Sequence, residues 1–325
     1  MSYINKPKFK HPQLKTNEIG LTRRDYEGTL TTLCAGCGHD SISAAIIQAA
    51  ADMALEPHRV AKISGIGCSS KIPSYFLSKS HGFNSVHGRM PSVATGTVLA
   101  NRDLVAVGVS GDGDTASIGI GQFVHMVRRN LPVVYIVENN GVYGLTKGQF
   151  SATSDIGSKL KTGVVNEFPA VDLCGLAVEL GATYVARSFA GDPKQVVNLL
   201  KGAFAHGGTA FLDIISPCVT FNNQPDSTKS YTWGKENEEL IQEVDFIPFF
   251  DEIDIDYKEG EVVDVELHDG SRVVLKKLER DYNPTNRRKA VELLLKAEED
   301  KQFLTGLIYV NTEKNNLIDL LNLVD

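Results

Sequence analysis

Short β-branched runs alternate with helix-like stretches from Arg59 to Pro217, and this alternation limits the possible folds more than any other feature of the sequence. Several of the runs are apolar throughout, as strands covered on both faces tend to be. We therefore predict an α/β fold in which helices cover both faces of a mostly parallel sheet. The expected strands are Val60–Ser64, Leu104–Val109, Val133–Val137, Thr183–Val185 and Ala210–Ile215.

Helix signals divide the chain further. Asp192 stands at an N-cap position, and Pro193 opens a helix that should end near Gly207. The composition changes after Trp233, where an amphipathic helix is expected near residues 286–300. We predict an N-terminal arm, an α/β domain and a C-terminal extension, at residues 1–30, 31–233 and 234–325.

Charge and hydropathy exclude several classes of partner. The 325-residue chain has a formal net charge of −7 at pH 7 and no dense cluster of Lys and Arg, so nucleic acid is not expected. No run reaches the roughly 18 apolar residues of a membrane span, and Met1–Gly20 has no apolar signal-peptide core. We expect a cytoplasmic protein with no membrane partner. Its 5 cysteines are too few, and odd in number, for a secreted disulfide framework.

Oxygen-bearing side chains follow two neighbouring strands of the predicted sheet. Ser110–Asp114 reads SGDGD after the first strand, and Glu138–Gly141 reads ENNG after the next. The carboxyl ends of parallel strands face one crevice, so Asp112 and Asn140 can share an ion such as Mg²⁺. The flanking Gly111 and Gly113 would let an anion approach the backbone.

Each of these motifs alone is an ordinary turn sequence. Together they are more specific, because the interval from Asp114 to Asn139 fits one helix and one strand. The pair resembles the fingerprint of thiamine-diphosphate enzymes, a GDG followed by NN. That resemblance implies that the metal ligands are Asp112, Asn140 and the main-chain carbonyl of Val142.

Four cysteines lie on loops of the same predicted domain. Cys34 and Cys37 form a CxxC before a helix, Cys68 ends the sequence GIGC after a strand, and Cys218 follows the last strand. Four thiolates suit zinc or an iron-sulfur cube. A redox pair or inert buried cysteines are the other interpretations. Cys174 falls within a helical pattern and is interpreted as core.

The joint occurrence of both motifs, in order between about Thr31 and Trp233, resembles one family. It is the thiamine-diphosphate-binding β subunit of the 2-oxoacid:ferredoxin oxidoreductases. The resemblance implies that the four cysteines bind one [4Fe-4S] cluster. It also implies further cofactor contacts at Gly36, Gly67, Gly111, Gly113, Asp114, Gly144 and Leu145.

The family reaction joins a 2-oxoacid, coenzyme A and oxidised ferredoxin to give acyl-CoA, carbon dioxide and reduced ferredoxin, and it can run in reverse. The resemblance implies that thiamine diphosphate, Mg²⁺ and the cluster are the cofactors. It places the catalytic Glu on a partner α subunit, since no Glu stands here in a pyrimidine-domain context. The chain should therefore be inactive alone and work in an (αβ)₂ assembly.

We expect 2-oxoglutarate as the substrate, converted to succinyl-CoA and carbon dioxide, and its recognition would depend on a few basic residues. A dicarboxylate such as 2-oxoglutarate needs a cation, and Lys71 with Arg89 are the candidates, while resemblance associates Lys71 and Leu145 with substrate selection. Lys147, in the loop after the metal ligands, is a further candidate for binding an anionic substrate. Lys71 can equally balance the charge of the cofactors, and Lys147 can simply be solvated. His39, His87 and His125 are candidate proton carriers, among which His87 is preferred.

Other interpretations stay open at this point. Pyruvate or another 2-oxoacid can replace 2-oxoglutarate as the substrate. A non-redox thiamine-diphosphate decarboxylase would leave the cysteines without a role. A zinc-stapled assembly subunit would leave the diphosphate motif without one.

Overall fold

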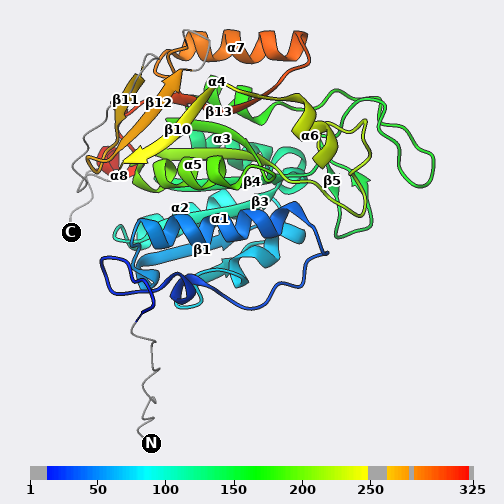
Figure 1. The fold of residues 1–325 in the computed structure, drawn as a ribbon. Coiled ribbons are helices and arrows are strands. Elements are labelled where there is room, and N and C mark those ends of the chain that lie inside the picture. The colour runs from blue at the N-terminus through cyan, green and yellow to red at the C-terminus, as the bar shows by residue number, and fades with distance from the viewer. Residues whose placement is uncertain (1–12, 248–261, 278–281, 322–325) are drawn as a thin grey trace, which may run out of the picture.

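The computed structural model describes residues 13–247, 262–277 and 282–321. Its main feature is an eight-stranded sheet in the order β2-β1-β3-β4-β8-β7-β13-β9 (Figure 1). The strands from β2 to β7 pair in parallel, β13 runs antiparallel to β7, and β9 pairs in parallel with β13. Their bounds are β1 Val60–Ser64, β2 His81–Asn84, β3 Val105–Gly111, β4 Val133–Asn139, β7 Tyr184–Phe189, β8 Thr209–Ile215, β9 Glu238–Leu240 and β13 Phe303–Val310.

Helices cover both faces of this sheet. On the buried strand β4, Val134 and Ile136 pack into one apolar core, whereas Val133, Tyr135 and Val137 pack into the other. This alternation follows from the period of two in a strand. Figure 1 shows α1 and α5 lying across the face that is turned toward the viewer. The helices of that core are α1 (Gly38–Asp52) and α5 (Pro193–Ala205), and those of the other are α2 (Met90–Ala100), α3 (Ile120–Arg128), α4 (Leu173–Leu180) and α7 (Arg287–Glu299).

The predicted fold class is therefore confirmed. All five expected strands are present, Val60–Ser64 with the expected bounds and the other four with shifted ends, and the expected Asp192 cap is confirmed. The Asp192 side chain accepts a hydrogen bond of 3.1 Å from the Gln195 amide at the start of α5, and Asn286 caps α7 in the same way through the Lys289 amide.

Residues beyond 233 complete the main sheet, because they supply its last two strands, β9 and β13. They also supply a small antiparallel sheet in the order β10-β12-β11, whose buried Val244 and Phe246 belong to the core of α1 and α5. The division of the chain at residues 30 and 233 stays a prediction. The remaining elements are η1 (Arg23–Tyr26), η2 (Pro57–Arg59), η3 (Cys68–Ser74), η4 (Gly113–Ile118), β5 (Val142–Tyr143), β6 (Gln149–Phe150), α6 (Tyr231–Asn237), β10 (Gln242–Ile247), β11 (Val262–Glu266), β12 (Arg272–Lys277) and α8 (Leu317–Leu321).

The parallel strands bring four loops to one edge of the sheet. The ends of β1, β3, β4 and β8 lead into the segments that begin at Gly65, Asp112, Asn140 and Ser216. All the cysteine and oxygen motifs that the sequence singled out lie on these loops or at the start of α1. None of the helices in the part of the chain that the structure describes has the length and hydropathy of a membrane-spanning segment.

Candidate cofactor site

Four cysteines approach one another at this edge. Cys34 and Cys37 precede α1, Cys68 follows β1, and Cys218 follows β8. The Thr220 hydroxyl donates a hydrogen bond of 3.5 Å to Cys34 Sγ, which ties the loop after β8 to the CxxC loop. The structure thus brings together cysteines that lie far apart in the sequence.

The loop that follows the Asn-Asn motif passes beside two of these sulfurs. A side-chain carbon on Gly144 would lie 3.6 Å from Cys218 Sγ and 3.8 Å from Cys68 Sγ. Gly36 and Gly67 have φ angles of +80° and +133°, a region that side chains rarely adopt. Glycine is therefore required by the backbone at positions 36 and 67, within the two loops that carry the cysteines.

The environment of the thiols disfavours their ionised form. Burial raises the pKa of Cys37 to about 12, and negative charge on Glu138, Cys218 or Cys68 acts in the same direction. Burial also raises the pKa of Cys68, and Lys71 opposes that effect only in part. Thiolates at these positions need nearby cations, which the irons of a cluster would supply. The donor set therefore fits a four-thiolate cluster.

A single metal ion fits less well. Among residues 13–247, 262–277 and 282–321, no three His, Cys, Asp or Glu side chains lie close enough together to hold one ion. A cube of four irons holds its thiolates farther apart than one zinc ion does.

The fifth cysteine, Cys174, is buried in α4, where its sulfur contacts the Ala186 carbonyl, as the sequence predicted for a core residue.

The Asp112 carboxylate lies at the end of β3 and is almost completely buried, with 1% of its surface exposed. The Thr153 hydroxyl donates a hydrogen bond of 2.6 Å to Oδ2, and the Ser151 hydroxyl donates to the same oxygen. Oδ1 accepts only a long bond of 3.3 Å from the Asn140 amide. Burial raises the pKa of Asp112, and the two hydroxyls lower it. This carboxylate has an oxygen with spare capacity for an ion.

The Asn-Asn motif lies against this carboxylate. The Asn140 side chain folds back so that its oxygen accepts a hydrogen bond of 3.0 Å from the Val142 amide. Asn140 and Val142 are both buried. The three expected Mg²⁺ ligands are therefore brought to one place by the ends of two neighbouring strands.

Asp114 differs from Asp112, because both of its carboxylate oxygens have close hydrogen-bond partners within the protein. Oδ1 lies 2.5 Å from His87 Nδ1 and accepts a bond of 2.9 Å from the Gly88 amide, while Oδ2 accepts one of 2.9 Å from the Ser110 hydroxyl. A side chain at Gly65 would collide with this carboxylate. Asp114 thus joins the ends of β1 and β3 to the segment before α2.

Gly113 is required by a neighbouring side chain. A Cβ at this position would lie 2.6 Å from the Tyr143 ring, and the Tyr143 hydroxyl donates a bond of 2.8 Å to the Gly113 carbonyl. We expected this glycine to make room for an anion. Its contact with Tyr143 is a second reason for its small size.

One small cavity is lined by residues of both the cysteine group and the Asp112–Asn140 motifs. It has a volume of about 70 Å³, and both Cys68 and Asp112 line it. The cavity lies at the carboxyl edge of the sheet, where α/β folds bind their ligands. Its other walls include His39, Ile66, Gly67, Ser69, His87, Gly111, Gly113, Asp114, Asn140, Val142, Tyr143, Gly144, Leu145 and Thr146.

Comparison with known proteins agrees with this geometry. Residues 65–214 match the model of the thiamine pyrophosphate enzyme C-terminal TPP binding domain. The chain is 39% identical over 246 residues to the 2-oxoacid:ferredoxin oxidoreductase subunit beta of a Sulfolobus species, which covers 74% of this chain and 78% of the relative. The corresponding subunit of Saccharolobus solfataricus is 38% identical over 247 residues, with 76% and 77% covered.

The chain belongs to this family of beta subunits. The 2-oxoacid:ferredoxin oxidoreductase family predicted from the sequence is thereby confirmed. A solved structure is also similar, with a TM-score of 0.76 at 31% identity over 94% of this chain and 90% of the other. It is the 2-oxoglutarate:ferredoxin oxidoreductase from Magnetococcus marinus, with 2-oxoglutarate, coenzyme A and succinyl-CoA bound. The 2-oxoglutarate synthase subunit KorB of Methanocaldococcus jannaschii is 38% identical over 189 residues, covering 58% of this chain and 69% of that one.

The candidate substrate residues of this beta subunit are spread around the cavity. Leu145, which is 50% exposed, and His87 line it, whereas Lys71, Arg89 and Lys147 do not. Lys71 lies close enough to Cys68 to act on the pKa of that thiol. Arg89 is exposed at the start of α2. The structure therefore brings His87 and Leu145 directly to the site.

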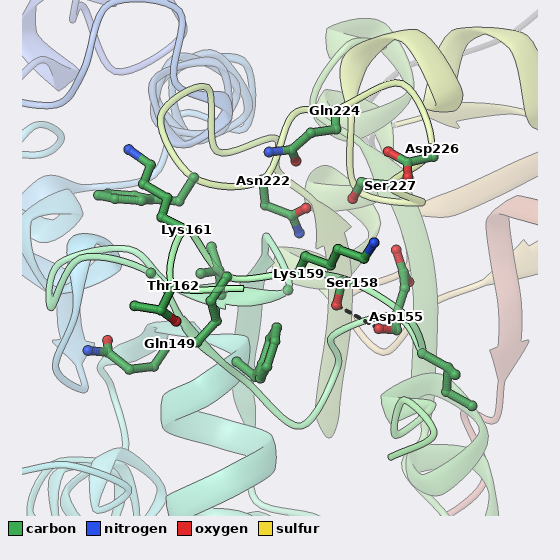
Figure 2. Close-up of a pocket in the computed structure, with 18 of the residues that line it drawn as sticks. Gln149, Asp155, Ser158, Lys159, Lys161, Thr162, Asn222, Gln224, Asp226 and Ser227 are labelled. Atoms are coloured by element: carbon green, nitrogen blue, oxygen red, sulfur yellow. Dashed lines mark hydrogen bonds between the residues drawn. The ribbon is translucent and has the colours of Figure 1, made fainter. Parts of the chain in front are cut away.

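Lys147 lines a larger, separate cavity. This cavity has a volume of about 510 Å³ and lies between the loop after the Asn-Asn motif and the loop after Cys218. Figure 2 shows polar side chains around it, among them Lys159, Lys161 and Asn222. Lys161 Nζ lies 5.0 Å from the centre of the Phe221 ring. The larger cavity carries both lysine and aspartate side chains, and it lacks the cysteine and Asp112 side chains of the smaller one.

The other two candidate histidines are not placed for proton transfer at this site, because His125 does not line the cavity and His39 lines it but is buried. His125 is exposed on α3. His39 is buried, its Nδ1 lies 2.5 Å from the Ser216 hydroxyl, and burial lowers its pKa to about 4. We interpret His39 as a neutral structural histidine.

Sequence reasoning missed three residues at this site. Glu138 is fully buried, both of its carboxylate oxygens lack a hydrogen-bond partner, and Oε2 lies 3.6 Å from His39 Nε2. Burial raises the pKa of Glu138 well above its usual range. Ser151 and Thr153, which bind Asp112, lie just after β6 (Gln149–Phe150). Their closely spaced hydroxyls were the only signal in the sequence.

Proposed function

We propose that this beta subunit binds thiamine diphosphate with Mg²⁺ and a [4Fe-4S] cluster, and that with an alpha subunit it converts a 2-oxoacid and coenzyme A to acyl-CoA and carbon dioxide. The observation that carries the proposal is the cavity lined by both Cys68 and Asp112. A redox decarboxylase needs its electron acceptor beside the organic cofactor. A decarboxylase without redox chemistry has no use for cysteines at this position.

Each residue has a definite part in this proposal. Asp112, Asn140 and the Val142 carbonyl would hold Mg²⁺, and Cys34, Cys37, Cys68 and Cys218 would hold the cluster. When bound, thiamine diphosphate supplies the carbanion chemistry of decarboxylation, and the cluster accepts electrons singly. The glycines and Tyr143 of the cavity wall shape the diphosphate pocket. His87, oriented by Asp114, would move a proton at its free Nε2.

The proposed substrate is 2-oxoglutarate. Support comes from the similar Magnetococcus marinus enzyme, whose solved structure holds 2-oxoglutarate, and from relatives named 2-oxoglutarate synthase subunits. Lys71 is the candidate for binding the distal carboxylate, with Arg89 as a second cation and Leu145 as the apolar wall. Charge balance at Cys68 is the competing role for Lys71.

The proposed assembly is (αβ)₂ in the cytoplasm, with ferredoxin as the electron acceptor. An alpha subunit is implied by the names of the relatives, which are beta subunits. We propose that it brings the Glu that activates thiamine diphosphate. The domain limit at residue 233 is proposed on the change in composition there, and the limit at residue 30 on the start of the family resemblance near Thr31.

The test is an anaerobic purification of the complex with its alpha subunit. We expect a brown protein with four irons for each beta chain, together with thiamine diphosphate and Mg²⁺. It should reduce ferredoxin with 2-oxoglutarate and coenzyme A faster than with pyruvate. A colourless complex that contains zinc would overturn the redox proposal, and a brown complex without thiamine diphosphate would overturn the decarboxylase proposal.

A further inference from the structure

A chain of buried polar side chains runs from Asp112 across the sheet. Thr153 Oγ1, which donates to Asp112, also lies 3.0 Å from the Asn139 side-chain oxygen. The Asn139 amide donates a bond of 2.9 Å to Asp213. Arg187 Nε then donates one of 3.3 Å to the other oxygen of Asp213.

This chain is built into the strands. Asn139 ends β4, Asp213 lies on β8 and Arg187 lies on β7, where Arg187 and Asp213 are direct partners in the sheet register. Thr153, Asn139 and Asp213 are each at most 3% exposed. A second ion pair, to Asp172 at the N-cap of α4, holds Arg187 at its outer end. The Asn139 oxygen beside the Thr153 hydroxyl is thus held by regular secondary structure.

The Ser151 and Thr153 hydroxyls bind the same oxygen of Asp112, the carboxylate that is the expected Mg²⁺ ligand. Ser151 and Thr153 both donate to Asp112 Oδ2, which leaves Oδ1 with a single long bond from the Asn140 amide. The Thr153 hydroxyl has one hydrogen and two possible acceptors, Asp112 Oδ2 and the Asn139 side-chain oxygen. Asp112 Oδ2 is the nearer of the two and carries charge, so it is the stronger acceptor. The geometry therefore directs the hydrogen bonds to Oδ2.

We propose that Ser151 and Thr153 are positioning residues for Mg²⁺, which they direct to Asp112 Oδ1 by holding Oδ2. Asn139, which Asp213 and Arg187 hold, offers the second acceptor within reach of the Thr153 hydroxyl. This inference rests on the proposed function, because it concerns the same ion. It adds that metal affinity depends on side chains that never touch the metal.

The same residues also form the wall of a neighbouring cavity. Asn139, Thr153, Asp172, Arg187 and Asp213 line a space of about 500 Å³ on the side of α7 and β13. These buried polar residues therefore border a second cavity, away from the cysteines. Substitutions within the chain can be made without touching the cluster loops.

The test compares three variants of the αβ complex. Each is stripped of metal with a chelator, and Mg²⁺ is titrated back at saturating thiamine diphosphate while the retained cofactor is measured after gel filtration. Thr153→Val removes the hydroxyl at nearly constant volume and should raise the half-saturating Mg²⁺ concentration about tenfold or more. Thr153→Ser, which restores a hydroxyl, should return it to within about threefold of wild type.

The matched control is Thr209→Val, which removes another buried threonine hydroxyl, one that bonds the Leu131 carbonyl. Its Mg²⁺ requirement should equal that of wild type. Equal Mg²⁺ requirements for Thr153→Val and wild type would overturn the inference, as would equal shifts for Thr153→Val and Thr209→Val.

If Thr153→Val does not fold, Ser151→Ala tests the same oxygen from the other hydroxyl and should also raise the Mg²⁺ requirement. Wild-type complex that retains no cofactor at any Mg²⁺ concentration would instead contradict the proposed function. The two failures are therefore distinguishable.

Discussion

His87 Nδ1 lies 2.5 Å from Asp114 Oδ1, and both residues line the cavity that Cys68 and Asp112 share. The Gly88 amide bonds the same oxygen, so the carboxylate fixes both the ring and the backbone that carries it. An imidazole held through Nδ1 presents Nε2 as its free nitrogen. His87 is thus the histidine of this site with an oriented ring and an accessible edge.

We predict that His87→Gln lowers kcat about a hundredfold, because general acid-base groups contribute on that order. Retention of thiamine diphosphate should be unchanged. Both are measured on the αβ complex, with His125→Gln as the matched exposed control. A wild-type kcat in His87→Gln would exclude a proton-transfer role, and a loss of cofactor retention would assign the residue to structure instead.

We predict that Asp112→Ala abolishes retention of thiamine diphosphate. Without the bridging ion, the diphosphate would face a buried site with no cation to neutralise it. The measurement is cofactor content after gel filtration at saturating Mg²⁺. Retention equal to that of wild type would mean that the metal ligands are elsewhere.

We predict that each of four single substitutions bleaches the cluster of the anaerobically purified complex: Cys34→Ser, Cys37→Ser, Cys68→Ser and Cys218→Ser. Cys174→Ser is the matched control and should keep the cluster, because Cys174 is buried in α4 among core residues. Iron content and visible absorbance are the readouts. Bleaching by Cys174→Ser, or colour retained in one of the other four variants, would contradict the ligand set.

The predictable part of this site followed from strand topology. Parallel strands end at one edge, so a GDG after β3 and an NN after β4 had to meet, and the same rule placed Cys68 and Cys218 beside them. Glu138 was named in the ENNG motif but given no role, because the expected strand ended at Val137, whereas β4 runs to Asn139 and buries this carboxylate. Ser151 and Thr153 were missed because they reach Asp112 only through the fold of the loop after β6.

The fold was also predicted only in part, because some strands were expected from the sequence and others were not. One strand, Val60–Ser64, was expected with its full bounds, and the other four expected strands have shifted ends in the structure. β13 was not expected, although all its residues are buried. It joins the sheet antiparallel to β7 from the far end of the chain, and local periodicity carries no information about such a distant pairing. The edge strand β2 is exposed along its length and has no apolar pattern to reveal it.

Acid should destabilise the protein through His206. Burial lowers the pKa of His206 to about 3, and its Nε2 lies 2.7 Å from the Thr183 hydroxyl. Between about pH 6.5 and pH 3 the unfolded chain takes up a proton that the folded chain does not, so stability falls as the pH falls, by at most about 1.4 kcal/mol for each pH unit.

The variant His206→Gln removes this titrating side chain. Its melting temperature should therefore fall less between pH 7 and pH 5.5 than that of wild type. The control is His125→Gln, at an exposed histidine, which should keep the wild-type slope. An unchanged slope in His206→Gln would show that other groups cause the acid sensitivity.

The last prediction concerns substrate choice. If Lys71 binds the distal carboxylate of 2-oxoglutarate, Lys71→Met keeps the packing of the stem and removes a charge-assisted hydrogen bond. The loss should be about 1.5 to 3 kcal/mol, or roughly tenfold to a hundredfold in kcat/KM. It should fall on 2-oxoglutarate and spare pyruvate, since pyruvate has no distal carboxylate.

The competing role gives a different pattern. If Lys71 only balances charge beside Cys68, both substrates should lose activity alike, and the reduction potential of the cluster should shift with the lost charge. The measurement is kcat/KM for both 2-oxoacids in wild type and Lys71→Met, with the alpha subunit present. Because the two roles act on different steps, an equal drop refutes substrate binding by Lys71, and a drop confined to 2-oxoglutarate refutes pure charge balance.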